Sequence, residues 1–400
     1  MAVSIPIPQQ VMPVIHFSEE QASTHFRLVN HAVEHGIKRL YHADNLDVLA
    51  ALIKDPNVCG KVNLIYIDPP YNTGGAFETR DFVHAYSDNL SPEDYLNFMR
   101  PRLKLLHKVL ADSGSIYVHL DSNMVFHIKV MMDEIFGMSN FRGMITRKKC
   151  KSKNYTHKTY GNISDYILFY TKSNDAIWNR PYEQWSDEKL LKEYPYIEEG
   201  TGRRYKKVPC HAPGTRNGAT GTAWRGIMPP PGKHWQYTPE KLEELDAKGE
   251  IYWSSNGNPR RKVYLDQSAG IPVQDIWLDY IDINNQNTLT TGYPTEKNID
   301  MLKRIIEASS NKGDLVLDCF AGSGTTLVAA EELGRQWIGI DIGDESIRTI
   351  QNRFVNGSKP MGDYSKKYKQ QKTLSLFDDP VIIEQHTQGP TIEYDFFEAI

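Results

Sequence analysis

The chain has 400 residues, which is long for one ordinary domain and fits one large α/β domain that carries an inserted module. Hydrophobic residues make up 40% of it and charged residues 24%, a composition that allows a sizeable core and excludes a disordered chain. The formal net charge of -4 gives no global signature of nucleic-acid binding, so any contact with DNA must depend on local positive clusters.

Cysteine usage and apolar runs exclude further classes of protein. Cys59, Cys150, Cys210 and Cys319 stand alone, without a CxxC pair or metal-ligand spacing, so neither a disulfide scaffold nor a metal site is expected. The beginning of the chain lacks the charged start and long apolar stretch of a signal peptide. No segment approaches the run of about 18 apolar residues that a membrane helix needs, so we expect a cytoplasmic protein without a membrane partner.

From about residue 40 the pattern alternates between helix and strand. The run 62–67 is apolar at nearly every position, as in a strand covered on both faces. Ser91 and Pro92 supply an N-cap and a first-turn proline to the helix that follows. The expected helices cover residues 45–53, 91–110, 124–136, 295–308, 325–333 and 344–354, and the expected strands cover residues 62–67, 114–120, 165–170, 315–317 and 337–341. This alternation predicts an α/β fold with a doubly wound, mostly parallel sheet.

The alternation stops between about residues 172 and 290, where Trp, Tyr, Gly, Pro and basic residues are frequent. We therefore predict an insert over 172–290 between two parts of one α/β domain, 26–171 and 291–356. Residues 357–400 form a polar tail that ends in an acidic and aromatic stretch. We expect this tail to be frayed, with a docking segment as the alternative.

A glycine-rich turn follows the apolar run 315–317. Residues 318–326 read Asp-Cys-Phe-Ala-Gly-Ser-Gly-Thr-Thr, and a buried strand followed by such a turn and a helix typically binds an adenosine-containing cofactor. No lysine follows the glycines, which argues against a Walker phosphate loop. Asp341 ends the next expected strand and is placed to bind ribose hydroxyls. On these residues alone a nicotinamide cofactor also fits.

The second motif is Asp68-Pro69-Pro70-Tyr71, which ends the apolar run 62–67. It offers a carboxylate, a rigid carbonyl group and an aromatic ring at one point. The alternative is a simple turn after a strand, but average composition gives this tetrapeptide in only roughly one chain in a thousand of this length. We therefore interpret the motif as catalytic.

Together, and in this order, the two motifs resemble the DNA amino-methyltransferases of the β arrangement. Residues 41–46 and 64–74 are similar to the opening of type III modification subunits and their single-chain relatives. Residues 293–297, Tyr-Pro-Thr-Glu-Lys, resemble the family's motif upstream of the cofactor loop. The family usually has Pro where this chain has Asn298, which predicts a less rigid helix start. The resemblance covers about residues 41–175 and 224–354.

The resemblance implies S-adenosylmethionine as cofactor and double-stranded DNA as substrate. Asp68 and the Pro69 carbonyl would accept the two N–H groups of an exocyclic amine, Pro70 would stiffen the turn, and Tyr71 would stack on a base flipped out of the duplex. The cofactor-binding residues that it implies are Asp44, Asn45, Thr295, Lys297, Asp318, Phe320, Ala321, Gly322, Ser323, Gly324, Thr325 and Asp341.

Relatives that act on cytosine more often carry Ser at the position of Asp68, so we expect a site-specific adenine-N6 DNA methyltransferase. Cytosine-N4 methylation is the alternative within the family. From another class, the chain could be a sequence-reading DNA-binding subunit of a restriction or defence complex. A homodimer and a restriction subunit are the other partners that the resemblance suggests.

Local basic clusters favour contact with DNA phosphates. The candidate residues are Arg147, Lys148, Lys149, Lys151, Arg203, Arg204, Arg260 and Arg261. The alternative interpretation is that these basic residues lie on solvated loops and do not contact DNA. Trp224, Trp235, Tyr237 and Trp253 either contact bases or form the core of the insert. By resemblance, 172–290 is the target-recognition segment.

Overall fold

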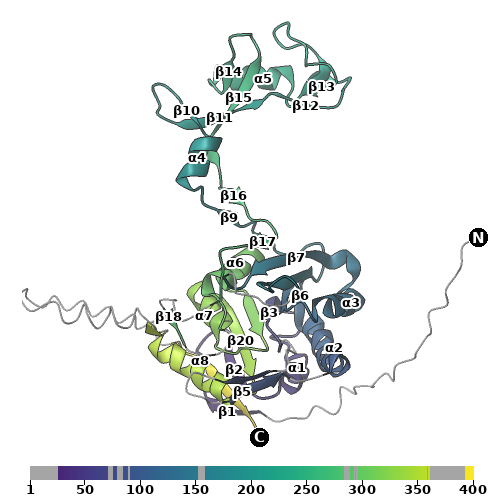
Figure 1. Cartoon of the computed structure of the whole chain (residues 1–400), viewed down its shortest axis with the longest axis vertical. Helices are drawn as coiled ribbons and strands as arrows, with labels where there is room; N and C mark the ends of the chain where they lie inside the picture. The colour runs from purple at the N-terminus through teal and green to yellow at the C-terminus, as the bar shows by residue number, and fades with distance from the viewer. Residues whose placement is uncertain are drawn as a thin grey trace, which may run out of the picture. The chain divides into compact units, whose positions relative to one another are not determined.

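The computed structural model describes residues 26–70, 75–78, 84–88, 91–151, 158–282, 289–291, 293, 296–357, 359–360 and 392–400. This part of the chain forms two compact units. The first unit runs up to Arg180 and resumes at Gln274, and the second is Pro181–Val273 (Figure 1). The second unit lies inside the range 172–290 that the composition marks as an insert.

A ten-stranded sheet forms the centre of the first unit, in the order β1-β22-β2-β20-β19-β3-β6-β8-β7-β17. In that order the strands are Phe26–Asn30, Asp395–Ala399, Lys38–His42, Gln336–Asp341, Leu315–Asp318, Val62–Ile67, Leu110–Leu120, Ser164–Thr171, Phe141–Lys148 and Ile276–Trp277. All neighbours from β22 to β6 are parallel. This topology confirms the doubly wound, mostly parallel sheet. The strand order reverses between β19 and β3, where a ligand site is expected.

Helices cover the two faces of this sheet (Figure 1). The first group is α1 (Asn45–Leu52), α2 (Pro92–Val109) and α3 (Val125–Phe136), and the second is α6 (Ile299–Ser309), α7 (Thr325–Glu332) and α8 (Asp344–Asn356). Asp44 caps α1 and Ser91 caps α2, each through a side-chain oxygen that accepts a backbone N–H. These helices agree with the sequence expectation except at α6, which begins at Ile299.

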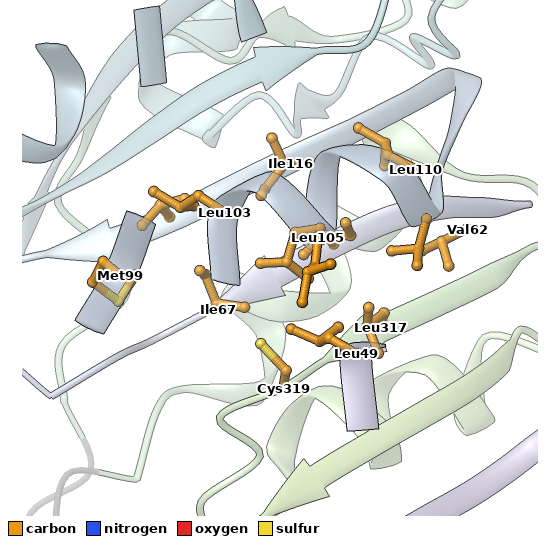
Figure 2. Packing of buried hydrophobic residues seen from close by; sticks show 14 of the residues in the cluster. Leu49, Val62, Ile67, Met99, Leu103, Leu105, Leu110, Ile116, Leu317 and Cys319 are labelled. Carbon is orange, nitrogen blue, oxygen red and sulfur yellow. The ribbon is translucent and has the colours of Figure 1, made fainter. Parts of the chain in front are cut away.

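The core between α1, α2 and the sheet is built from aliphatic side chains (Figure 2). Val62 and Ile67 of β3 and Leu103 of α2 are fully buried in it, together with Leu49 and Leu317. Because β3 and β19 are covered by helices on both faces, nearly all their residues are apolar, which explains why both strands were predictable. The same packing fixes the strand ends from which the two sequence motifs leave the sheet.

The second unit has a small sheet and a core of its own. Its sheets contain β10 (Tyr196–Ile197), β11 (Arg204–Pro209), β15 (Pro259–Tyr264) and β14 (Ile251–Trp253), then β12 (His211–Pro213) with β13 (Lys233–Trp235), and β9 (Tyr182–Glu183) with β16 (Ile271–Pro272). Its helices are α4 (Asp187–Glu193) and α5 (Pro239–Ala247). Trp224 and Trp235 are buried in its core, with Tyr237 and Trp253 packed against them. The core interpretation of these aromatic residues therefore holds.

The described residues also form two further strand pairs. These are β4 (Gly75–Glu78) with β5 (His84–Asp88), and β18 (Leu289–Thr290) with β21 (Lys359–Pro360). Among the described residues, no helix combines the length and hydropathy that crossing a bilayer requires.

The end of the chain corrects one expectation. Residues 395–399 are not frayed, because they form β22, which lies between β1 and β2 in the sheet. Phe396 is buried, and Phe397 stacks on Tyr41 with ring centroids 4.6 Å apart. Asp395 and Glu398 flank the two Phe residues and interrupt the apolar pattern typical of a strand, which concealed β22 in the sequence.

We predict that Phe396→Ala lowers the free energy of unfolding by about 3 kcal/mol, the usual cost of removing a buried Phe side chain. Urea denaturation of the whole chain measures this change. Ile400→Ala, at a side chain that is 84% exposed, is the control and should stay within about 0.5 kcal/mol of the wild type. Equal stabilities of the Phe396 variant and the wild type would show that β22 contributes nothing to the fold.

Candidate active site

A cavity of about 290 Å³ lies where the strand order reverses. Its walls come from the segments that follow β2, β3, β19 and β20, and from α2. Most of the predicted catalytic and cofactor residues line it. They are Asp44, Asn45, Asp68, Pro69, Pro70, Lys297, Asp318, Phe320, Ala321, Gly322, Ser323, Thr325 and Asp341. Tyr71 and Thr295 lie outside the described residues.

The glycine turn is held in shape by Asp318. Oδ1 of its carboxylate accepts the backbone N–H of Phe320 at 3.0 Å, and Oδ2 accepts the hydroxyl of Thr326 at 2.5 Å. Gly324 has φ of +73°, and a Cβ there would lie 2.9 Å from Cγ1 of Ile350. A left-handed backbone against a neighbouring side chain leaves room only for glycine. Gly324 therefore has a structural role in the turn beside its predicted role in binding.

Asp341 closes the other side of this turn. One carboxylate oxygen accepts the N–H of Gly322 at 2.8 Å, and the other accepts the N–H of Gly343 at 2.9 Å. Burial raises the pKa of this carboxyl, although both hydrogen bonds favour its charged form. Each carboxylate oxygen can accept a second hydrogen bond, so a ribose diol fits this position. The ribose role of Asp341 stays a prediction.

The pKa of Asp318 is also shifted within the cavity. Burial, and then the charges of Asp68 and Asp341, raise its pKa to about 7, against the lowering effect of the hydrogen bonds from Thr326 and Phe320. A cation that enters the cavity would favour the charged form of this carboxyl. The carboxylates therefore make the cavity suitable for a positively charged ligand.

A buried arginine ties the turn to the segment before α6. Nη1 of Arg353 donates to Oε1 of Glu296 at 3.1 Å, to Oγ1 of Thr325 at 2.8 Å and to the carbonyl of Ser323 at 3.2 Å. Oε2 of Glu296 accepts the backbone N–H and the hydroxyl of Thr291, both at 2.8 Å. The glycine turn and residues 291–297 are thus held as one unit.

Lys297 connects this unit to the catalytic motif. Its Nζ lies 2.6 Å from Oδ2 of Asp68, and only 7% of the residue is exposed. The sequence predicted a contact with the cofactor for Lys297, and the structure shows that its ammonium group pairs with Asp68. Asn298 corrects the expectation of a loose helix start, because its side chain caps α6 by accepting N–H bonds from Asp300 and Met301.

Two residues of α2 complete the cavity and were missed from the sequence. Arg102 is buried, and it donates to Asn45 Oδ1 at 2.6 Å and to Asp44 Oδ1 at 2.8 Å. Its guanidinium lies 3.5 Å from the centre of the Phe98 ring. Asn45 in turn donates to the carbonyl of Cys319 at 2.6 Å. The sequence signal that could have identified Arg102 is a charged residue on the apolar face of an amphipathic helix.

The basic residues predicted to contact DNA lie in different environments. Arg147 is fully buried within β7, between Asp165 and Asp282, so the prediction of a phosphate contact is wrong for this residue. The sequence analysis missed β7 and interpreted its basic end as a cluster that contacts DNA. Arg203 forms a bidentate pair with Asp266 at 2.7 and 2.9 Å.

The other candidates are more accessible or bound within their own unit. Arg204 donates to the carbonyl of Tyr194, and Arg261 donates to the hydroxyl of Tyr237. Lys148 and Lys149 are half-buried, whereas Lys151 and Arg260 are exposed. Contact of these residues with DNA stays a prediction.

The fold and the cavity define a doubly wound α/β protein with a nucleotide-cofactor site at its switch point. A family model described as DNA methylase (N6_N4_Mtase) matches residues 62–352. The chain belongs to this family of S-adenosylmethionine-dependent DNA methylases.

Three relatives illustrate the similarity. The type II methyltransferase M.EcaI of Enterobacter cloacae is 53% identical over 304 residues, which cover 76% of this chain and 67% of that protein. The StyLTI Mod subunit, a type III restriction-modification enzyme of Salmonella typhimurium LT2, is 31% identical and covers 73% of this chain and 49% of its own length. The DNA adenine methyltransferase YhdJ of Escherichia coli K12 is 27% identical over 337 residues, which cover 82% of this chain and 88% of that protein.

The pKa of Asp318 predicts how cofactor affinity depends on pH. S-adenosylmethionine carries two positive charges, on its sulfonium and ammonium groups, and one negative charge, on its carboxylate. It therefore favours the ionised form of Asp318. Below pH about 7, where Asp318 holds a proton, binding of the cofactor releases that proton. Affinity should therefore rise as pH increases from 5.5 to 7, by up to about tenfold per pH unit, and then level off.

Isothermal titration calorimetry of the wild type and Asp318→Asn measures this dependence. The Asn side chain keeps an acceptor for Phe320 N–H but has no proton to release. Cofactor affinity of Asp318→Asn should therefore rise less steeply with pH than that of the wild type. Parallel profiles for the two proteins would contradict the raised pKa of Asp318.

Proposed function

We propose that this chain is a site-specific DNA methyltransferase that transfers a methyl group from S-adenosylmethionine to N6 of an adenine flipped out of duplex DNA. The observation that carries the proposal is the position of Asp68 and Pro69 in the same cavity as the glycine turn and Asp341. A hydrogen-bond acceptor pair for an amine and a pocket for an adenosine cofactor thus share one space.

The chemistry asked of the protein is positioning. An exocyclic amine is a poor nucleophile because its lone pair is delocalised into the base. When bound, S-adenosylmethionine supplies an electrophilic methyl group. Asp68 and the Pro69 carbonyl each accept a hydrogen bond from one N–H group of the amine. These hydrogen bonds favour a pyramidal nitrogen, whose lone pair then points at that methyl group. Lys297 lies 2.6 Å from Oδ2 of Asp68 and holds this side chain in one orientation, which is preorganisation of the site.

Adenine is preferred over cytosine for two reasons. This chain carries Asp68 where relatives that act on cytosine more often carry Ser, and a carboxylate can accept the N6 amine directly. One relative that aligns over most of both chains is a DNA adenine methyltransferase. The matched part covers only 49% of the StyLTI Mod subunit. By analogy with that type III restriction-modification enzyme, we propose a restriction subunit as a partner of this chain.

Nucleoside mass spectrometry of duplex DNA after incubation with labelled S-adenosylmethionine tests the proposed activity. We expect N6-methyladenine from the wild type and a loss of at least about 10³-fold in the rate for Asp68→Ala, with cofactor affinity largely retained. Asp112→Ala, at an exposed carboxylate on β6, should be unaffected. N4-methylcytosine as the product would reverse the base assignment, and an active Asp68→Ala enzyme would refute the role of Asp68.

We further propose that the second unit contacts DNA through the face that carries Arg260 and Lys233. Both residues are exposed, and in the described part of the chain no carboxylate forms an ion pair with either. Burial lowers the pKa of His211, and the charges of Lys233 and Arg260 lower it further, so the two cations lie near that histidine. Several other cations of this unit, among them Arg203 and Arg225, are already paired with carboxylates.

We expect Arg260→Ala to weaken DNA binding at all sequences and to reduce the dependence of log K on log salt by about 1. Arg203→Ala is the matched control, because its guanidinium is committed to Asp266 and should release few counterions. Fluorescence anisotropy with a labelled duplex at several salt concentrations measures both variants. The same salt dependence in the wild type and the Arg260 variant would exclude a phosphate contact by this residue.

A further inference from the structure

A row of polar side chains crosses the sheet beside the cavity. Tyr66, His119, Asp165 and Arg147 come from the adjacent strands β3, β6, β8 and β7. At most 2% of each residue is exposed. Burying two charged groups and an imidazole in a sheet costs free energy that an apolar set of the same volume would not. The row is therefore a poor means of stabilising the fold, and a different role is indicated.

The members of the row contact one another in strand order. The hydroxyl of Tyr66 lies 2.7 Å from Nδ1 of His119, and Nε2 of His119 lies 2.9 Å from Oδ2 of Asp165. Nη1 of Arg147 lies 3.6 Å from the same carboxylate oxygen. Since a carboxylate can only accept, Nε2–H of His119 faces Asp165, and in this tautomer Nδ1 accepts from the Tyr66 hydroxyl.

The charge of Asp165 fixes this arrangement. Burial by itself raises its pKa, but His119, Arg147 and Lys297 together lower the pKa below the ordinary value, so the carboxylate is ionised. An ionised Asp165 holds the histidine in one tautomer and one orientation. The acceptor nitrogen is thereby always presented to Tyr66.

One end of the row is in the active site. Tyr66 lines the cavity together with Asp68, which directly follows the end of β3 two residues later. The charge of Asp68 contributes to the raised pKa of Tyr66, after the larger effect of burial, which confirms that the two groups are close. The hydrogen bond of the Tyr66 hydroxyl therefore fixes a side chain next to the proposed amine acceptors.

The other end of the row holds the chain segment that returns from the second unit. Nε of Arg147 donates to the carbonyl of Tyr280 at 2.9 Å, and its Nη2 pairs with Asp282. The segment also joins β7 through β17, in which Trp277 is the partner of Arg147. The first unit thus anchors this segment on the same side chain that completes the row.

We propose that His119 is a positioning residue for methyl transfer, which acts by fixing Tyr66 beneath Asp68 while Asp165 and Arg147 hold the imidazole in place. This proposal rests on the proposed function. Methyl transfer requires the nitrogen, the methyl carbon and the leaving sulfur to align, and a displacement of about 1 Å can cost 10²-fold in rate. Neither His119 nor Asp165 needs to touch the cofactor or the base for this effect.

Two substitutions test the two ring nitrogens of His119 separately. In His119→Gln the side-chain amide reaches the place of Nε2 and can donate to Asp165, but it leaves Tyr66 without its acceptor. In His119→Asn the amide oxygen takes the place of Nδ1 and can accept from Tyr66. We expect kcat to fall about 10- to 100-fold for His119→Gln, and most of it to return in His119→Asn.

Tyr66→Phe removes the other partner of the same hydrogen bond and should lower kcat as much as His119→Gln does. The double variant should be no slower than either single variant, because both remove one interaction. The KM for DNA and the Kd for S-adenosylmethionine should stay within about threefold. Tyr117→Phe is the control: this buried tyrosine on β6 bonds Ser309 at 2.7 Å, outside the row, and its loss should leave kcat within about twofold.

The proposal is overturned if His119→Gln and Tyr66→Phe keep wild-type kcat, or if their effects multiply in the double variant. It is also overturned if kcat, Kd and thermal stability decline together in these variants and in Tyr117→Phe, since the row would then be merely structural. A wild-type enzyme that binds the cofactor but methylates no DNA would instead refute the proposed function, and this outcome is separate because it requires no variant.

Discussion

The parallel pairing of β19 with β3 is the constraint on which the rest of the site depends. Leu317 is the partner of Ile65 in this pair, so the glycine turn after β19 and the Asp-Pro-Pro motif after β3 leave the sheet side by side. Neither motif contains enough chemistry by itself. Their adjacency at the reversal of strand order places cofactor residues and amine acceptors around one cavity, whatever the separation in sequence.

The cavity concentrates negative charge, and the fold compensates for it with buried cations. Asp68, Asp318 and Asp341 line one space, and burial, with a further contribution from the two neighbouring charges, raises the pKa of Asp318. Lys297 pairs with Asp68, and Arg353 binds Glu296 next to the glycine turn. Both interactions fix loops that a ligand must approach closely. The residual negative charge suits a cofactor with a sulfonium centre, which explains why binding and protonation should be coupled.

Apolar runs and motifs were readable from the sequence, whereas the roles of isolated charges were not. β3 and α2 were predicted nearly to the residue because continuous burial and an N-cap leave clear patterns. β7 was missed because its residues are mostly half-buried, and Arg147 was therefore taken for a surface residue. Partners distant in sequence decide whether a charge is buried, as they do for Arg102, and no local pattern identifies those partners.

A crystal structure with a non-reactive cofactor analogue and a duplex that contains the recognised site tests the central claim most directly. The account predicts the adenosine ribose at Asp341, the sulfur position above the glycine turn, and the flipped adenine with N6 within hydrogen-bond distance of Asp68 and the Pro69 carbonyl. An analogue bound outside the cavity between β19 and β3, or a target base that does not reach Asp68, would contradict it.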